Sequence, residues 1–426
     1  MANRNQIFHN PSMEDRNTVK FTLRPTNVGY ANTLRRSIMT DIIILGFRAD
    51  MTENGSTIDV KVFKNTTPMS NEMLADRIGL LPIAMPADAL KWQKEKILFR
   101  LKVKNDTDDF RLVTASDFEC LESRADSEDL VRIPNTEFFH PHPITLETCT
   151  IAVLKPKDEI HLEAYSTLGS GREHPRFNPT CQCSYKYSLD SDPIRIKMRL
   201  ENWLREQKMI DPKDLEKEPS KRDALISEFS SLELYRVYEV DAEGEPVSFD
   251  FSVESTGTMP VTKIVLEGLK AVVRRLEKYE DIENVDLPNV DIRPADAQMK
   301  GFDFIIKGED HTLGNVLQTW IDENEMKDGK ITFVGYKVPH PLVDEMVLRI
   351  GVEDGKEETA RKVFGDSVKA LMDMYATWAS EWIITMKNNA LPIPSEYASE
   401  DTQKTVWAAH SGVKQASAVR KTGMKK

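Results

Sequence analysis

Apolar positions near the two ends of the chain follow the same pattern. Residues 21–38 (FTLRPTNVGYANTLRRSI) and residues 304–321 (FIIKGEDHTLGNVLQTWI) both show a short alternating apolar run, a polar turn, and then apolar residues at helical spacing. Each segment therefore predicts a strand, a turn and an amphipathic helix. Aligned at one constant offset, the two copies share identical residues that include Phe21 with Phe304, Asn32 with Asn315 and Ile38 with Ile321.

The match between the copies resumes in two further blocks. Residues 64–74 align with 337–347, and the alternating residues 247–253 align with 346–352, which predicts a strand in both copies. A helix with an apolar seam at heptad-type spacing follows each of these strands. The seam residues are Val265, Leu269, Val272, Leu276 and Tyr279 in the first copy, and Phe364, Val368, Leu371, Tyr375 and Trp378 in the second.

These two seams predict how the copies are arranged. Burying a large apolar side chain contributes roughly 1.5–3 kcal/mol, so five such residues on each helix are not expected to remain in water. We expect an α+β fold in which two similar dimerisation modules bury their seams against each other as an intrachain pseudo-dimer.

The segments between the matching blocks suggest further boundaries. We expect a first module formed by 1–74 and 246–283, a linker at 284–301, a second module at 302–390 and a flexible basic tail at 391–426. Residues 75–245 would form a mostly β inserted domain with a helical extra at 201–240. Alternation predicts two of its strands, with inward residues Ile97, Phe99, Leu101 and Val103 in one and Ile194, Ile196, Met198 and Leu200 in the other.

Charge and composition exclude several classes of protein. The net charge of −12 argues against a surface that grips a phosphate backbone, although no acidic residue follows Asp401 and the end of the chain is basic. That end is either a solvated tail or a contact for nucleic acid or localisation. No apolar stretch is long enough to span a bilayer, and the N-terminus lacks the pattern of a signal peptide, so we expect an intracellular protein with no membrane partner.

Several of these segments resemble known RNA polymerase subunits. FTLRPTNVGYANTLRRSIM, LADRIGLLPI and GSGREHPRFNPT resemble the third-largest subunit of eukaryotic RNA polymerase II, its archaeal counterpart and, more distantly, bacterial α. EDHTLGNVL with VGYKVPHPLVDEMVLRI resembles the eleventh subunit and the archaeal protein that corresponds to it. Both in one polypeptide is similar to the fused version encoded by large cytoplasmic DNA viruses of the African swine fever type.

The resemblance implies a non-catalytic assembly platform for transcription, a structural subunit that needs no cofactor. Its expected partners are the largest and second-largest polymerase subunits and small subunits resembling the tenth and twelfth. It would reside in the virion and host cytoplasm if viral, and otherwise in the nucleus. Matched by motif, the surface facing the second-largest subunit would contain Asn32, Leu34, Arg35 and Arg36, although solvated helix charge is an equally good interpretation of the two arginines.

Two alternatives concern chemistry. A stand-alone hydrolase or metalloenzyme would use His311 with Glu309 or Asp310, but neighbouring residues in one turn point in different directions and no nucleophile motif accompanies them. A sequence-specific DNA-binding factor is disfavoured by the acidic total and the lack of a zinc finger or basic helix.

Some relatives hold a metal in the inserted domain, where this chain lacks closely spaced cysteines. Cys181 and Cys183, with His174, are either metal ligands or plain strand residues, and we expect no metal.

Overall fold

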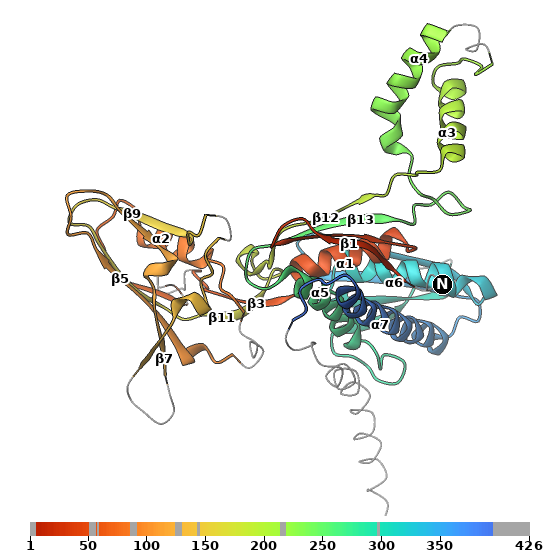
Figure 1. Cartoon of the computed structure of the whole chain (residues 1–426). Helices are drawn as coiled ribbons and strands as arrows, with labels where there is room; N and C mark the ends of the chain where they lie inside the picture. The colour runs from red at the N-terminus through yellow and green to blue at the C-terminus, as the bar shows by residue number, and fades with distance from the viewer. Residues whose placement is uncertain are drawn as a thin grey trace, which may run out of the picture.

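The molecule has three visible parts. The computed structural model describes residues 6–50, 57, 59–85, 92–123, 130–142, 145–213, 219–295 and 299–394. A central body contains both ends of the described chain and the longest helices. A β-rich unit lies to one side of this body, and an arm of two helices projects from it elsewhere (Figure 1).

The central body contains two four-stranded antiparallel sheets with equivalent strand orders. The first sheet has the order β1 (Phe8–Met13), β2 (Thr18–Leu23), β13 (Phe249–Ser255) and β12 (Thr180–Tyr187). The second has the order β14 (Val290–Pro294), β15 (Gly301–Lys307), β17 (Glu345–Val352) and β16 (Ile331–Lys337). The strands predicted in the first and third repeated blocks are therefore confirmed.

Each sheet is accompanied by two helices, in the order that the repeat predicts. They are α1 (Val28–Thr40) and α5 (Val261–Glu277) beside the first sheet, and α6 (His311–Asn324) and α7 (Glu357–Asn388) beside the second. Helix α5 packs against α7, and α1 packs against both α5 and α6. Figure 1 shows these helices together beneath the first sheet.

The two halves of the central body share one apolar core. Trp382 of α7 packs against Phe8 and Phe21 of the first sheet, with ring centroids 5.0 Å and 5.1 Å away. Its indole nitrogen donates to the carbonyl of Thr262 at 2.9 Å. Because a buried indole N–H needs an acceptor, this bond fixes the ring while its apolar surface fills the core.

A glycine permits the close approach of α1 and α5. A Cβ atom at Gly268 would lie 2.4 Å from Cγ1 of Ile38, which is fully buried. Such a contact is shorter than van der Waals packing allows, so any larger residue would push the two helices apart.

The β-rich unit differs from the expected inserted domain at both boundaries. Strand β4 (Val60–Asn65) and helix α2 (Asn71–Gly79) belong to its core, so the unit begins before residue 75. Its five-stranded sheet has the order β4, β10 (Glu159–Ala164), β5 (Ile97–Lys104), β7 (Glu119–Glu122) and β8 (Val131–Ile133). The strand predicted from Ile97 to Val103 is confirmed as β5.

Two short strand pairs complete this part of the chain. Strand β6 (Arg111–Thr114) pairs with β9 (Thr150–Leu154). Strand β3 (Ile43–Gly46) pairs with β11 (Thr167–Ser170) where the chain leaves and re-enters the central body. After β11, the chain returns to the first sheet as β12, so residues 180–187 are not part of the inserted domain.

The second repeated block aligns segments that differ in structure. Residues 64–74 end β4 and begin α2, whereas residues 337–347 end β16 and begin β17. Strand β4 pairs in the β-rich unit, and β12 occupies the edge position that β16 holds in the second sheet. The two segments are therefore similar in sequence, but β4 and β16 do not occupy equivalent positions in their sheets.

The strand predicted at Ile194–Leu200 is wrong, because this segment is helical. Helix α3 (Pro193–Glu206) starts at the N-cap Asp192, whose carboxylate accepts from the Ile194 N–H, and proline occupies its first turn. It lies beside α4 (Pro219–Glu228) in the projecting arm. Apolar side chains of α3 pack against those of α4 and the turn that follows it, which stabilises the helical form of this segment. They include Ile196, Leu200, Trp203, Leu204, Leu225 and Phe229.

The segment expected to be a linker is partly a strand. Residues 290–294 form β14, which pairs with β15 at the edge of the second sheet. Acidic and proline residues suggested an extended tether, but an edge strand tolerates both, since one side of its backbone needs no partner. The expected tail at 391–426 falls outside the described residues from 395 onward.

Candidate functional site

The acidic turn at 308–311 caps helix α6. Asp310 is the N-cap residue, and its carboxylate accepts from the Thr312 N–H at 2.8 Å. A carboxylate at this position satisfies an unpaired helix N–H and interacts favourably with the helix dipole.

The same turn also binds an arginine from the other half of the central body. Arg275 of α5 donates from Nε to Glu309 at 2.7 Å and from a terminal nitrogen to Asp310 at 2.7 Å. Its other terminal nitrogen reaches Asp41 at 3.2 Å, just beyond the end of α1. Arg275 is 7% exposed and Glu309 is 2% exposed, so this pair is almost fully removed from water, whereas Asp310 is 32% exposed.

Neighbouring groups complete the cluster. Tyr279 donates its hydroxyl to Glu309 at 3.2 Å, and Arg172 lies 3.5 Å from Asp310. Burial raises the pKa of the Tyr279 phenol, and the negative charge of Glu309 raises it further. Burial alone would raise the pKa of Asp310, but Arg275 and the hydrogen bonds from Thr312 outweigh that effect and lower it to about 2.

This lowered pKa predicts a specific loss of stability in acid. A carboxyl whose pKa is about 2 when folded and 3.8 when unfolded stabilises the fold fully above the higher value. The contribution is about 2 kcal/mol, of which about half should be lost near pH 3. The difference in unfolding free energy between the wild type and Asp310→Asn, measured in urea at pH 6 and pH 3, should shrink accordingly.

Asparagine is a suitable replacement because it also caps helices well, so the comparison isolates the charge. A difference that stays constant from pH 6 to pH 3 would contradict the assignment of a lowered pKa to Asp310.

The proposed catalytic grouping of His311 with the adjacent carboxylates is not supported. Glu309 and Asp310 face Arg275, whereas His311 is exposed and lies edge-on to the ring of Tyr336. General acid–base chemistry needs these groups to converge on one point, and here they diverge. The turn joins helices and has no arrangement for proton transfer.

Every residue of the two predicted seams is buried in the shared core. The least buried of them, Trp378, is 6% exposed, and Phe364, Val368, Leu371 and Tyr375 are fully buried. The Tyr375 hydroxyl donates to the Tyr30 carbonyl of α1 at 3.0 Å, which links the two halves at a polar point. The first-half seam residues are likewise buried: Val265, Leu269, Val272, Leu276 and Tyr279.

The four residues expected to face a partner divide into three groups. Leu34 is fully buried in the core, so it cannot contact a partner; it follows the apolar stripe of α1 instead. Arg36 donates from Nε to Thr312 at 2.7 Å and lies 3.7 Å from Asp310, which joins α1 to α6. Asn32 and Arg35 line a groove on the surface, whereas the smaller pocket that Arg36 lines lies between α1 and α6, beside His311.

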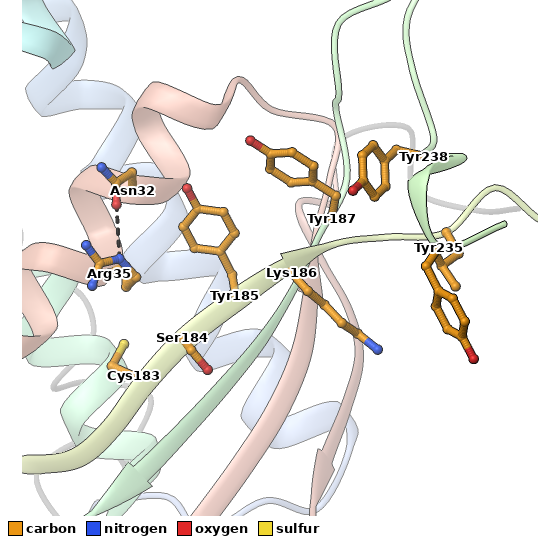
Figure 2. A pocket seen from close by; sticks show the side chains of 10 residues that line it. Asn32, Arg35, Cys183, Ser184, Tyr185, Lys186, Tyr187, Tyr235 and Tyr238 are labelled. Atoms are coloured by element: carbon orange, nitrogen blue, oxygen red, sulfur yellow. Dashed lines mark hydrogen bonds between the residues drawn. The ribbon is translucent and has the colours of Figure 1, made fainter. Parts of the chain in front are cut away.

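The groove lined by Asn32 and Arg35 has a volume of about 650 Å³ and lies between α1, strand β12 and residues at the base of the arm. Asn32 accepts from Arg35 Nε at 3.0 Å on the α1 wall (Figure 2). Five consecutive residues of β12 line the floor, and residues 189, 235 and 238 close the far end. In Figure 2, Tyr185 and Tyr187 project to one side of β12 while Ser184 and Lys186 project to the other.

Sequence reasoning missed Arg275, Asp41 and the tyrosines of the groove. The sequence did contain a signal for Arg275. It lies three residues after Val272 and four before Tyr279, which places it on the same face of the helix as these seam residues. A charged residue among buried positions indicates a buried ion partner.

The described residues contain no group of three His, Cys, Asp or Glu side chains able to hold a metal. Cys181 and Cys183 lie on β12, one exposed and one buried, because a bulge shifts the strand between residues 180 and 182. Burial raises the pKa of the Cys183 thiol to about 12, which disfavours the thiolate that a metal needs. Within the described chain, no helix is both long enough and apolar enough to cross a membrane.

Comparisons with known proteins point to one group. Residues 302–381 match the family model described as the RNA polymerase Rpb3/Rpb11 dimerisation domain. The chain is 22% identical over 273 residues to "DNA-directed RNA polymerase subunit Rpo3" of Pyrococcus furiosus, covering 62% of this chain and 91% of that protein. It is 24% identical over 298 residues to "DNA-directed RNA polymerases IV and V subunit 3B" of Arabidopsis thaliana, covering 62% and 88%.

Proposed function

We propose that this chain, which is homologous to RNA polymerase subunits of the Rpb3/Rpb11 type, is a non-catalytic structural subunit of a multisubunit DNA-directed RNA polymerase. It provides the platform on which the two largest subunits assemble. The observation that carries the proposal is the match of residues 302–381 to a dimerisation domain, because α7, most of which lies in that range, packs on α5 of the same chain.

We further propose that the chain is a fusion of two subunits. The first half would correspond to the third-largest subunit and residues 302–390 to the eleventh, joined as an intrachain pseudo-dimer. Their equivalent strand orders and the continuous core between α5 and α7 support this proposal. A viral origin, with work in the virion and host cytoplasm, accords with such a fusion; a nuclear location is the alternative.

The expected partners are the largest and second-largest subunits and small subunits resembling the tenth and twelfth. Asn32 and Arg35 remain our candidates for the surface facing the second-largest subunit, since both border the open groove. The hydrolase alternative is disfavoured because its two carboxylates are engaged by Arg275.

Co-purification tests this function. The full chain, tagged and expressed in its native source, should recover the two largest polymerase subunits in fixed stoichiometry, and the complex should elongate RNA. The tagged chain alone should show no nucleotidyl transfer. Recovery of the chain without either large subunit would overturn the proposal.

A further inference from the structure

The outer edge of β12 is an unpaired sheet edge. Strand β12 ends the order β1–β2–β13–β12, and within the described residues no strand pairs with its other side. Alternate N–H and C=O groups of an edge strand point away from the sheet and can pair with another extended chain. The groove follows this edge, since residues 183 to 187 line it without interruption.

The groove has walls that a flat sheet edge lacks. Helix α1 supplies Asn32 and Arg35 on one side, and the arm supplies Tyr235 and Tyr238 at the end. Tyr238 packs edge-on against Tyr187, with ring centroids 4.9 Å apart. The arm is therefore joined to the sheet edge and closes one end of the groove.

The charges lining the groove are all positive. Arg35 and Lys186 are its only ionisable side chains apart from tyrosines and Cys183, and no carboxylate lines it. In the described structure Arg35 contacts Asn32 and the Met39 sulfur but no carboxylate. Asp250 lies opposite Lys186 on β13, yet it accepts from the hydroxyls of neighbouring residues 22 and 188.

We propose that this groove binds an extended acidic segment of a neighbouring subunit, which adds a strand to the edge of β12. Backbone pairing along residues 183–187 supplies the register, Arg35 and Lys186 attract its carboxylates, and the tyrosines contact its apolar side chains. That the segment comes from a polymerase subunit rests on the proposed function, whereas its chemistry follows from the groove alone.

Photo-crosslinking in the assembled full-length complex tests the proposal. A benzoylphenylalanine side chain replaces Tyr235, which is 65% exposed at the end of the groove, or Lys186. Both positions should capture one acidic peptide, identified by mass spectrometry. The same replacement at Phe333, on edge strand β16 of the second sheet, is the matched control and should not capture it.

Two further readouts separate strand addition from loose contact. Hydrogen exchange of the amides in residues 180–187 should slow in the complex, because added pairing protects the outward N–H groups. The double variant Arg35→Glu/Lys186→Glu should reduce capture by about tenfold, the effect of losing two rim charges. Lys330→Glu, a charge reversal beside β16, should leave capture unchanged.

Each result decides the proposal. Capture of a basic peptide, a nucleic acid or a second copy of this chain, or no capture at either position, would overturn it. Unchanged exchange at residues 180–187 would overturn the added strand. Capture of an acidic peptide from a protein other than a polymerase subunit would retain the groove's chemistry and count against the proposed function instead.

Discussion

Replacing Arg275 with methionine should destabilise the folded chain by about 3–5 kcal/mol, because it leaves the buried Glu309 carboxylate without its hydrogen-bonded counter-charge. Glu309 is 2% exposed and keeps the more distant Arg172 as a cationic partner, at 3.9 Å, while Asp41 and Asp310 each lose a hydrogen bond from the Arg275 guanidinium. Urea unfolding of the full chain at pH 7 measures this loss.

The double variant Arg275→Met/Glu309→Gln separates pairing from packing. It removes the most deeply buried negative charge together with the arginine, so it should recover part of the stability lost in the single variant. If the double variant is less stable than Arg275→Met by the full cost of Glu309→Gln alone, the two residues do not interact as described.

Replacing Leu371 with aspartate should disrupt the contact between α5 and α7. Leu371 is fully buried on the seam of α7, so the change removes apolar contacts and places a carboxylate where the described core offers it no partner. We expect a loss above about 4 kcal/mol, measured as a fall in the midpoint of urea unfolding.

Leu342→Asp is the matched control for this variant. Leu342 is 89% exposed, so the same chemical change there should alter stability by less than about 0.5 kcal/mol. Equal losses in the two variants would mean that the seam does not hold the halves together.

The sequence predicted the parts of the fold that depend on periodicity. The seams of α5 and α7 could be predicted because apolar residues at heptad spacing indicate one buried face of a helix. The third repeated block also predicted strands at the positions of β13 and β17. Strand β5 was predicted for the same reason, since its inward residues alternate strictly.

The errors arose where local pattern and tertiary structure disagree. Only Ile196 and Leu200 of the alternating residues join the apolar face of α3, with Trp203 and Leu204, while Ile194 and Met198 are exposed. The N-cap Asp192 with the following proline is the signal that favours a helix. Leu34 was assigned to a partner surface by matching a motif of the related subunits, but its spacing on α1 directs it into the core. The groove could not be predicted, because it joins residues about 150 to 200 positions apart in sequence.

The origin of β12 has a consequence for folding. The second half completes its sheet from strands that lie within residues 290–352, so its contacts are local in sequence. The first sheet must wait for β12 and β13, which follow β2 only after the whole β-rich unit. Because non-local pairing slows folding, we expect two halves of like architecture to fold on different timescales, with the N-terminal strands waiting longest for their partners during synthesis.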